Sequence, residues 1–340
     1  MLLYILLIIL VVYLVFLAII KIKLKFWSKQ PVFHLHNLFY WANPPGIIKH
    51  SLPEKNRYVN FTDIEFMKFD NMIPKHLNKF VKLIQDNYLP QKENKYYPDI
   101  QNIIPYFTNH DQQCYCSLMF NDKITEKKEL IGAITGRPLS VSLYNNKFTS
   151  YYIDYLCVDK TKRKQGVAPQ LIQTHEYNQR RQNKSVSTCL FKREGNLTLI
   201  VPLVIYNTYG FKIQDWKIRR SLHPSIKLIK ITRDNFHLLS NLLNSTSKSF
   251  DCFMSNTLSN ILDLIDTNNY IVYALQQNQD LISAYFFRNS CMKYDEDKAT
   301  ECFCCINNSK NLQVYITGFS LASKKLQQKY KIILFENIGH

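Results

Sequence analysis

The apolar positions of the chain fall into one long run followed by many short periodic segments. The run extends from Leu2 to Ile20 without a charged residue, which is 19 residues. At about 1.5 Å per residue a helix of that length spans roughly 28 Å, enough for the hydrocarbon core of a bilayer. We therefore expect a single transmembrane anchor over residues 1-21.

A cleaved signal peptide is the alternative explanation of this run. No positive residue precedes it, its apolar core is too long for a signal peptide, and no small-x-small cleavage site follows before Lys21. Lysines at 21, 23, 25 and 29 lie on the C-terminal side, which by the positive-inside tendency places the rest of the protein in the cytosol. Phe26 and Trp27, directly after the run, also fit an interfacial aromatic belt.

Beyond a turn at residues 43–46, strand and helix periodicities alternate. Alternation in both halves of the chain favours two α/β lobes of related build, without fixed-period repeats or low-complexity segments. Helical spacing is expected in pieces over 62–87 and over 169–181, 236–243, 258–265 and 322–330. Strands are expected over 116–120, 130–135, 139–144, 151–158, 186–191, 302–306 and 331–335, with a hairpin of 270–275 and 281–287.

The charge balance favours an anionic partner. The formal net charge is +17, from 43 Lys and Arg against 26 Asp and Glu. Nucleic acid, a phospholipid surface and a phosphate-rich cofactor all fit such an excess, although a coding bias toward lysine explains it equally well. No nucleic-acid-binding motif is present, so we expect no nucleic-acid partner.

The cysteines point to a reducing compartment and to no metal site. Nine cysteines are present, and the groups Cys114-x-Cys116 and Cys302-x-Cys304-Cys305 have no partner pair at zinc spacing. They lie in alternating apolar stretches, so we interpret them as reduced thiols that pack as small hydrophobic side chains.

The segment 151–169 carries the strongest chemical signal. It begins as a strand, passes through the cations Lys162, Arg163 and Lys164, reaches Gly166 and becomes a helix near Pro169. A loop of backbone N–H groups that opens a helix N-terminus is suited to bind a pyrophosphate, and a residue without bulk lets the backbone approach the oxygens. The alternative to a phosphate-binding loop is a solvent-exposed basic turn without a ligand.

That junction resembles known acyltransferases. Arg163-x-x-Gly166-x-Ala168, followed by Tyr206-x-x-x-Gly210-Phe211, is similar to the GNAT superfamily of acyl-CoA-dependent N-acyltransferases. The segment 153–158 with 163–169 resembles more specifically the acyl-CoA core of eukaryotic N-myristoyltransferases, which are tandem-GNAT enzymes. The segment 25–32 resembles the N-terminal part of that family, which packs on the CoA. The match covers residues 24–211 in patches.

The resemblance implies an α/β architecture, namely a tandem GNAT-like acyl-CoA N-acyltransferase fold preceded by one transmembrane helix. Its acyl-CoA-binding lobe would cover 25-220, and a shortened second lobe would cover 221-340. The implied reaction moves a myristoyl group from acyl-CoA, a co-substrate, to the N-terminal glycine of a protein. No permanently bound cofactor and no metal are implied.

Roles follow for individual positions. The amides of Tyr155 and Leu156 would form the oxyanion hole for the thioester carbonyl. Thr188 would position the attacking amine, and Tyr206 would act as the general acid toward the leaving thiolate. The residues implied to bind the CoA are Lys25, Phe26, Trp27, Leu156, Cys157, Val158, Arg163, Lys164, Gln165, Gly166, Val167, Ala168 and Pro169.

Two substitutions and a second lobe shorter than that of the family keep alternatives open. Gly166 replaces an arginine of the myristoyltransferase loop, and Asp154 stands where the family has asparagine. The family's general base is its C-terminal carboxylate, here that of His340, so Asp154 is a second candidate base. Two alternatives to the myristoyltransferase therefore stay open. One is a short-chain GNAT acetyltransferase, and the other is a membrane-tethered acyl-CoA-binding protein without catalysis.

Overall fold

The computed structural model describes residues 1–42, 46–89, 94–121, 128–144, 146–195, 199–216 and 221–338. The chain forms two compact units. One comprises Met1–Leu52 with Arg193–Ile205, and the other comprises Pro53–Lys192 with Tyr206–His340. The turn expected at 43–46 falls largely outside the described residues.

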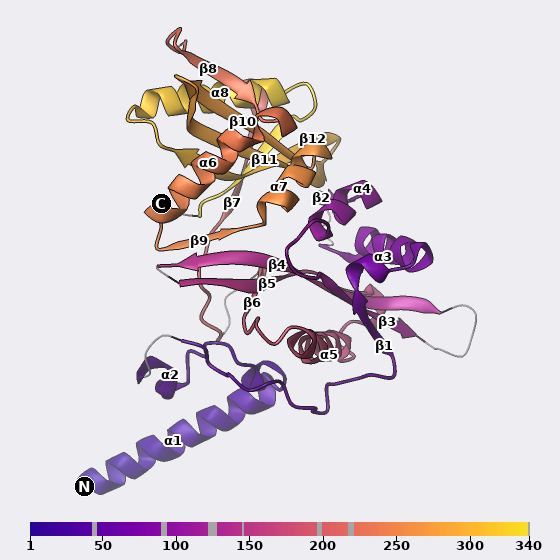
Figure 1. The fold of residues 1–340 in the computed structure, drawn as a ribbon. Coiled ribbons are helices and arrows are strands. Elements are labelled where there is room, and N and C mark those ends of the chain that lie inside the picture. The colour runs from indigo at the N-terminus through magenta and orange to yellow at the C-terminus, as the bar shows by residue number, and fades with distance from the viewer. Residues whose placement is uncertain are drawn as a thin grey trace. The chain divides into compact units, whose positions relative to one another are not determined.

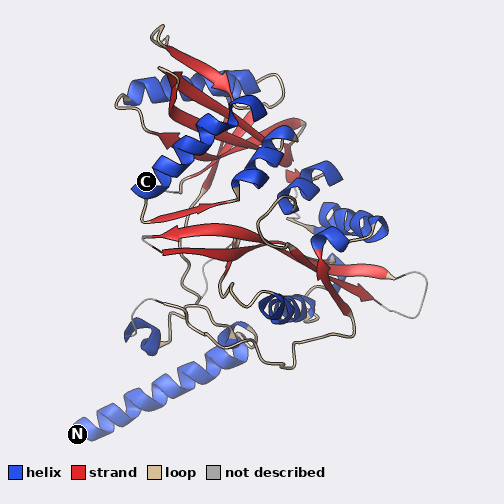
Figure 2. Cartoon of the chain, in the orientation of Figure 1, coloured by secondary structure: helices blue, strands red, loops and turns tan. Residues whose placement is uncertain are grey.

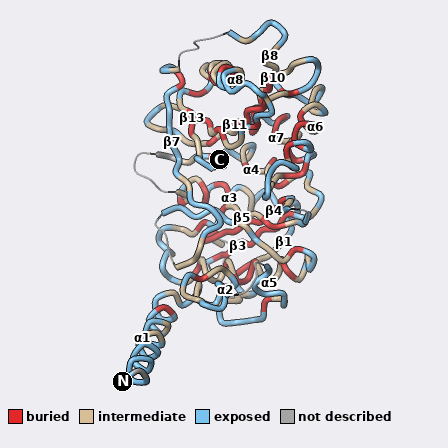
Figure 3. The backbone as a smooth tube through the Cα atoms, turned by 90° about the vertical axis from the view of Figure 1, so that its left-hand side faces the viewer, coloured by how far each residue is buried: buried red, intermediate tan, exposed pale blue. Residues whose placement is uncertain are grey.

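The first unit is built around the helix α1, Leu2–Lys23, whose apolar side chains are largely exposed (Figure 3). Among the described residues it is the one helix with the length and composition to cross a membrane, a test that signal sequences also meet. After the 3₁₀ turn η1, Trp27–Lys29, and the short α2, Leu38–Ala42, the chain pairs His34 with Ile200 in an isolated bridge. The apolar stretch after 199 therefore belongs with the N-terminal leader.

The second unit contains two sheets (Figure 1). In the described part of the chain, the first sheet has the order β1-β3-β4-β5-β6, and β9 also pairs with β4. All its pairings are antiparallel except β5 with β6. Its strands are β1 Ile64–Lys68, β3 Tyr115–Asn121, β4 Glu129–Leu143, β5 Asn146–Val158, β6 Cys189–Phe191 and β9 Cys252–Ser255.

Helices cover both faces of this sheet (Figure 2). On one face, α3, Pro74–Asn87, buries an apolar stripe together with α4, Ile100–Ile103, and the 3₁₀ turn η3, Ile104–Phe107. On the other face lies α5, Val167–Gln182, which carries Val167 and Leu171 into the core. Burial on two faces explains why β3 reads as a continuous apolar run.

Pro138 stands inside β4, where a proline would normally remove a ladder hydrogen bond. β4 pairs with β3 up to Gly136 and with β9 from Ser140 onward, so Pro138 falls between these two partners. Its opposite residue, Tyr151, donates its backbone N–H to Thr188 of the neighbouring chain segment and not to β4. The missing N–H of Pro138 therefore costs no hydrogen bond within the described sheet.

The second sheet has the order β7-β13-β12-β11-β10-β8 among the described strands, with β2 paired to the end of β11. α6, Phe236–Thr246, and α7, Leu258–Asp266, pack on one face, and α8, Leu312–Leu326, packs on the other. Its strands are β2 Asn94–Tyr96, β7 Thr208–Lys212, β8 Ile226–Lys230, β10 Tyr270–Gln277, β11 Asp280–Tyr294, β12 Asp297–Asn307 and β13 Ile332–Glu336.

The two sheets exchange strands. β7 precedes every other long strand of the second sheet in sequence, yet it pairs there with β13. Conversely, β9 follows β8 in sequence but pairs with β4 of the first sheet. The motif Tyr206-x-x-x-Gly210-Phe211 thus lies at the edge of the second sheet. Neither sheet is complete without a strand from the other part of the chain.

Most of the expected elements are present, with three corrections. The helical pieces expected over 62–87 are wrong at their start, because Ile64–Lys68 is an edge strand paired with β3. The two strands expected over 130–135 and 139–144 are one strand, β4. The helix expected over 322–330 begins ten residues earlier, at Leu312, and ends at Leu326. In each case pairing or packing with distant segments overrides the local pattern.

The position of α5 depends on Gly132 in β4. A Cβ built on Gly132 would lie 2.8 Å from Leu171 Cδ1 and 3.1 Å from Val167 Cγ1. Both partners are buried and have little room to move. The glycine therefore lets the first turn of α5 approach the sheet closely, and this turn follows directly on the predicted phosphate loop.

We expect Gly132→Ala to destabilise the protein by roughly 1–3 kcal/mol, because the added methyl overpacks this contact. Urea unfolding of the full chain in detergent measures the change. Gly210→Ala is the matched control, since its Cβ would meet Leu334 at an ordinary 3.5 Å. Equal stability changes in the two variants would contradict the close approach of α5.

Candidate functional site

The candidate site is centred on an irregularity in β5. Ala133 faces Cys157 and Thr135 faces Asp154, so Tyr155 and Leu156 together oppose the single residue Ile134. This is a β-bulge, in which the extra residue leaves the regular ladder. Tyr155 has a positive φ of 23° there. The bulge thus occurs at the two residues whose amides the sequence assigns to an oxyanion hole.

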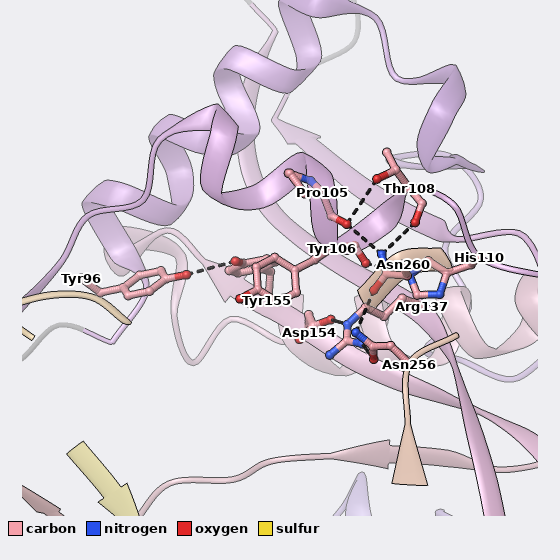
Figure 4. Close-up of polar contacts among 10 residues, drawn as sticks. All are labelled: Tyr96, Pro105, Tyr106, Thr108, His110, Arg137, Asp154, Tyr155, Asn256 and Asn260. Atoms are coloured by element: carbon pink, nitrogen blue, oxygen red, sulfur yellow. Dashed lines mark hydrogen bonds and ion pairs between the residues drawn. The ribbon is translucent and has the colours of Figure 1, made fainter. Parts of the chain in front are cut away.

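Packing of the Tyr155 side chain holds the bulge in place. The ring is 9% exposed and lies with its centroid 5.8 Å from that of Phe80, 5.5 Å from that of Tyr88 and 6.3 Å from that of Phe107. Its hydroxyl lies 3.0 Å from the hydroxyl of Tyr96 (Figure 4). A rare backbone conformation persists only where surrounding contacts determine it, and here an aromatic box does so.

The edge of β5 beside the bulge is open. The parallel ladder of β5 with β6 covers Tyr151–Ile153 against Cys189–Phe191, and in the described part of the chain no strand pairs with that edge beyond Ile153. Leu156 is 36% exposed. The backbone from Asp154 to Val158 therefore presents polar groups that a bound molecule can pair with.

The loop after β5 is braced by its own side chains. Asp159 accepts hydrogen bonds from the backbone N–H and the hydroxyl of Thr161, at 2.8 and 2.6 Å, and these bonds lower the pKa of Asp159. Arg163 donates from Nη2 to the carbonyl oxygen of Asn87 at 2.6 Å and from Nε to that of Val158 at 3.3 Å. The Arg163 guanidinium thus ties the loop to α3 and to the end of β5.

Gly166 ends this loop as the N-cap of α5, with φ +83°. That left-handed conformation favours glycine, and glycine has no side chain to cap the helix. Pro169 has no N–H, so the backbone N–H groups of Val167 and Ala168 are the first-turn donors of α5 that are left to another acceptor. Lys160, Lys162 and Lys164 lie in the loop that leads to Gly166 and give this segment positive charge. The arrangement suits a phosphate group.

A buried ion pair lies on the other side of the bulge. Arg137 of β4 donates from Nε to Asp154 Oδ2 at 2.8 Å and from Nη1 to Asn256 Oδ1 at 2.5 Å. Asn256 in turn donates to Asn260 Oδ1 at 2.8 Å, which places α7 in the same network (Figure 4). Burial raises the pKa of Asp154, and the positive charge of Arg137 offsets part of that rise.

A second ion pair stands nearby in the second sheet. Arg288 of β11 contacts Glu301 of β12 through two hydrogen bonds, Nε to Oε2 at 2.9 Å and Nη2 to Oε1 at 2.6 Å. Its charge also acts on Asp154 and lowers the pKa of that carboxyl. Positive and negative groups therefore alternate across the junction of the two sheets.

Two further predicted catalytic residues, Thr188 and Tyr206, lie near β6. Thr188 directly precedes this strand, and its hydroxyl is buried without a hydrogen-bond partner among the described residues. Lys192 follows the strand, forms an ion pair with Glu336 of β13, and lies 5.3 Å from the ring centroid of Tyr206. Burial raises the pKa of Tyr206.

The structure gathers most of the predicted positions and leaves some apart. Leu156, Cys157 and Val158 continue into the loop and α5, which carry Arg163–Pro169. The Cys157 thiol is buried in the strand, which raises its pKa to about 12, as fits a packing residue. Lys25, Phe26 and Trp27 belong to the other compact unit, so their contact with a CoA stays a prediction. His340 lies outside the described residues.

The sequence interpretation missed the partners of Asp154. Arg137 is a charged residue within the apolar segment Ile134-Thr135-Gly136-Arg137-Pro138-Leu139, and this was a signal for a buried ion pair. Asn256 and Asn260 gave no such signal, because their role depends on a contact over more than a hundred residues.

The chain is similar in sequence to known proteins. Residues 48–202 match the sequence model of the N-terminal domain of myristoyl-CoA:protein N-myristoyltransferase. The chain is 22% identical over 300 residues to a glycylpeptide N-tetradecanoyltransferase of Dictyostelium discoideum, covering 83% of this chain and 70% of that protein.

Solved structures agree on the fold. N-myristoyltransferase of Saccharomyces cerevisiae with bound myristoyl-CoA matches with a TM-score of 0.70 and 13% identity, covering 92% of this chain and 82% of that one. A tandem GNAT protein of the clavulanic acid biosynthesis pathway matches with a TM-score of 0.53 and 8% identity, over 82% and 91% of the two chains. Over residues 48–202 the chain is therefore similar in sequence to the N-terminal domain of N-myristoyltransferases, and the whole chain has the α/β fold seen in the yeast N-myristoyltransferase and in the tandem GNAT protein.

Proposed function

We propose that this protein is an acyl-CoA-dependent N-acyltransferase that moves a myristoyl group from CoA to the N-terminal glycine of a protein. The observation that carries the proposal is the bulge at Tyr155–Leu156, which lies on the open edge of β5 directly before the loop that ends at Gly166. A thioester bound along that edge has its carbonyl beside the bulge and its phosphates at α5.

The reaction forms one bond and breaks one. The neutral amine nitrogen of the acceptor attacks the thioester carbon, and negative charge develops on the carbonyl oxygen. The amides of Tyr155 and Leu156 donate to that oxygen, which stabilises the tetrahedral intermediate more than the bound thioester. Collapse of the intermediate breaks the C–S bond, and the CoA thiolate leaves with a proton.

Backbone groups and positive charge both contribute to binding the CoA part of the co-substrate. The first-turn N–H groups of α5 and the lysines at 160, 162 and 164 bind the CoA phosphates, and the backbone at Leu156, Cys157 and Val158 pairs with the pantetheine. Arg163 is occupied with the carbonyl oxygens of Asn87 and Val158, so it positions the loop. Gln165, Val167, Ala168 and Pro169 complete the turn into the helix.

Proton transfer involves groups at β5 and β6. Thr188 positions the acceptor amine with its unpartnered hydroxyl. Asp154 accepts the amine proton, because burial raises its pKa toward the range in which a carboxylate acts as a base near neutral pH. Tyr206 delivers a proton to the thiolate. The carboxylate of His340 is the alternative base.

The N-terminal helix anchors this activity to a membrane. We propose that α1 crosses the bilayer once, with its lysine-rich end and the catalytic part in the cytosol. Lys25, Phe26 and Trp27 then lie at the start of the cytosolic part and close over the CoA. An acyl-CoA and an acylated product both partition into membranes, so an enzyme held there meets both at high local concentration. We also propose that residues 25–220 form the acyl-CoA-binding lobe and that residues 221–340 form the second lobe.

The full chain in detergent is expected to transfer radiolabelled myristate from myristoyl-CoA to a peptide that begins with glycine, and to an otherwise identical peptide that begins with alanine at no more than a few per cent of that rate. Acetyl-CoA serves as the competing donor. Faster transfer from acetyl-CoA would move the assignment to a short-chain acetyltransferase. Binding of myristoyl-CoA by calorimetry without turnover on any amine would leave a non-catalytic acyl-CoA-binding protein.

Leu156 offers a matched pair of variants for the oxyanion hole. Leu156→Pro removes one amide donor, and we expect kcat to fall by about 10²–10³-fold. Leu156→Ala keeps the amide and changes a partly exposed side chain, so kcat stays near that of the parent. Thermal unfolding confirms that both variants fold. An equal loss of kcat in both would assign the effect to the side chain and reject the amide.

The anchor is tested by placing two charges at its centre. Leu10→Lys with Val11→Lys is expected to release the protein from membranes on alkaline carbonate extraction, since each charge in the hydrocarbon core costs about 2.5–3.5 kcal/mol on insertion scales. Leu203→Lys, which changes an exposed apolar residue outside α1, is the control and leaves the protein membrane-bound. Release of the unaltered chain by carbonate would contradict a spanning helix.

A further inference from the structure

A second bulge lies in β12 of the second sheet. Phe287 faces Cys302 and Phe286 faces Cys304, so Phe303 is an additional residue on the β12 side. Side chains alternate between the two faces of a strand, and one inserted residue shifts that alternation. Residues three apart across the bulge therefore come to the same face.

The packing of the side chains agrees with this shift. Cys302 is buried in the core cluster on the α8 face, with Ala322 and Leu326. Phe303 and Cys304 pack against the cluster on the opposite face, which α6 and α7 cover. Cys305 returns to the α8 face, where the Tyr315 hydroxyl hydrogen-bonds its sulfur. Cys302 and Cys305 are thus neighbours, whereas Cys304 points away from both.

The two sulfur atoms of this pair lie 3.3 Å apart, and the thiols are free. A disulfide requires about 2.05 Å, so closing the bond needs a sulfur movement of little more than 1 Å. Cys305 is exposed and Cys302 is buried, so an oxidant reaches Cys305 first. A hydrogen bond from the Cys302 thiol lowers the pKa of Cys305, which favours the reactive thiolate there.

We propose that Cys302 and Cys305 form a redox-active dithiol, which hydrogen peroxide converts reversibly into a disulfide within β12. The Cys305 thiolate attacks the peroxide oxygen, the O–O bond breaks, and the thiolate is oxidised to a sulfenic acid while the peroxide is reduced to water. The Cys302 sulfur then attacks the Cys305 sulfur and displaces a second water. Two electrons pass from the thiols to the peroxide, and a dithiol reductant reverses the change.

The position of the pair gives the modification a defined structural effect. Glu301, the residue before Cys302, contacts Arg288, and Cys302 faces Phe335 in the ladder with β13. A disulfide across the bulge fixes the backbone directly beside this buried ion pair. The proposal is independent of the acyl transfer reaction, since it rests on β12 alone.

Peptide mapping tests the proposal on the full chain in detergent. Cleavage after lysine places Cys302, Cys304 and Cys305 on one peptide, residues 299–310. In the Cys304→Ser variant the two alkylation labels on that peptide are expected to disappear after treatment with hydrogen peroxide and to return after dithiothreitol. In the unaltered chain, one of three labels is expected to remain after oxidation, on Cys304.

Cys305→Ser is the second variant, and it retains Cys302 and Cys304 on opposite faces of the strand. We expect its peptide to keep both labels after the same treatment. A disulfide formed as fast in Cys305→Ser as in Cys304→Ser would overturn the proposal, because it would not depend on the shared face. So would two labels retained in oxidised Cys304→Ser, or loss of the labels through a dimer on a non-reducing gel.

Discussion

One extra residue in β5 determines how the site is built. Tyr155 and Leu156 occupy the space opposite Ile134, and this places a rare backbone conformation in the middle of a sheet. Such a conformation costs on the order of 1–3 kcal/mol. Burial of the Tyr155 ring among aromatic side chains of α3 and η3 offsets this cost. Moving the ring out of these contacts would expose a large apolar surface. The packing of the core therefore stabilises the bulge. The same packing fixes the direction of the backbone amides of Tyr155 and Leu156.

The buried pair of Arg137 and Asp154 makes the same region depend on the second sheet. Two charges removed from water are tolerated when they contact each other and when their remaining hydrogen-bonding groups find partners. Asn256 supplies one of these partners, and Asn260 extends the network to the carbonyl oxygens of Pro105 and Thr108. Because β9 leads directly to Asn256, the strand exchange between the sheets delivers the residue that this ion pair needs. The two sheets are thus coupled by electrostatics as well as by backbone pairing.

Local patterns predicted most of this fold but not the contacts that complete the site. The strand at 151–158, the loop with Gly166 and the helix that follows were all predictable, because apolar period, glycine and helix-start signals lie within 20 residues. The bulge was not predictable from periodicity, since an inserted residue looks like ordinary sequence until the partner strand is known. The contact of Arg163 with α3 was not predictable for a similar reason, because the carbonyl oxygen of Asn87 that it contacts lies 76 residues away in the sequence. Edge strand β1 read as a helix because its burial depends on β3.

Both sheets contain a bulged hairpin strand followed by a helix, but the N-caps of the two helices differ. In each, a hairpin strand bulges just beyond its parallel ladder, at Tyr155–Leu156 in β5 and at Phe303 in β12, and a helix follows. The N-cap of α5, the helix after β5, is Gly166, which has no side chain to accept hydrogen bonds from the first turn. The N-cap of α8, the helix after β12, is Asn311, whose side-chain oxygen accepts hydrogen bonds from the N–H groups of Gln313 and Val314. A helix already capped by its own side chain has fewer donors left for a phosphate. Among the described residues, the N-cap of α5 therefore leaves its first-turn N–H groups without a side-chain acceptor, whereas Asn311 accepts from two N–H groups of α8.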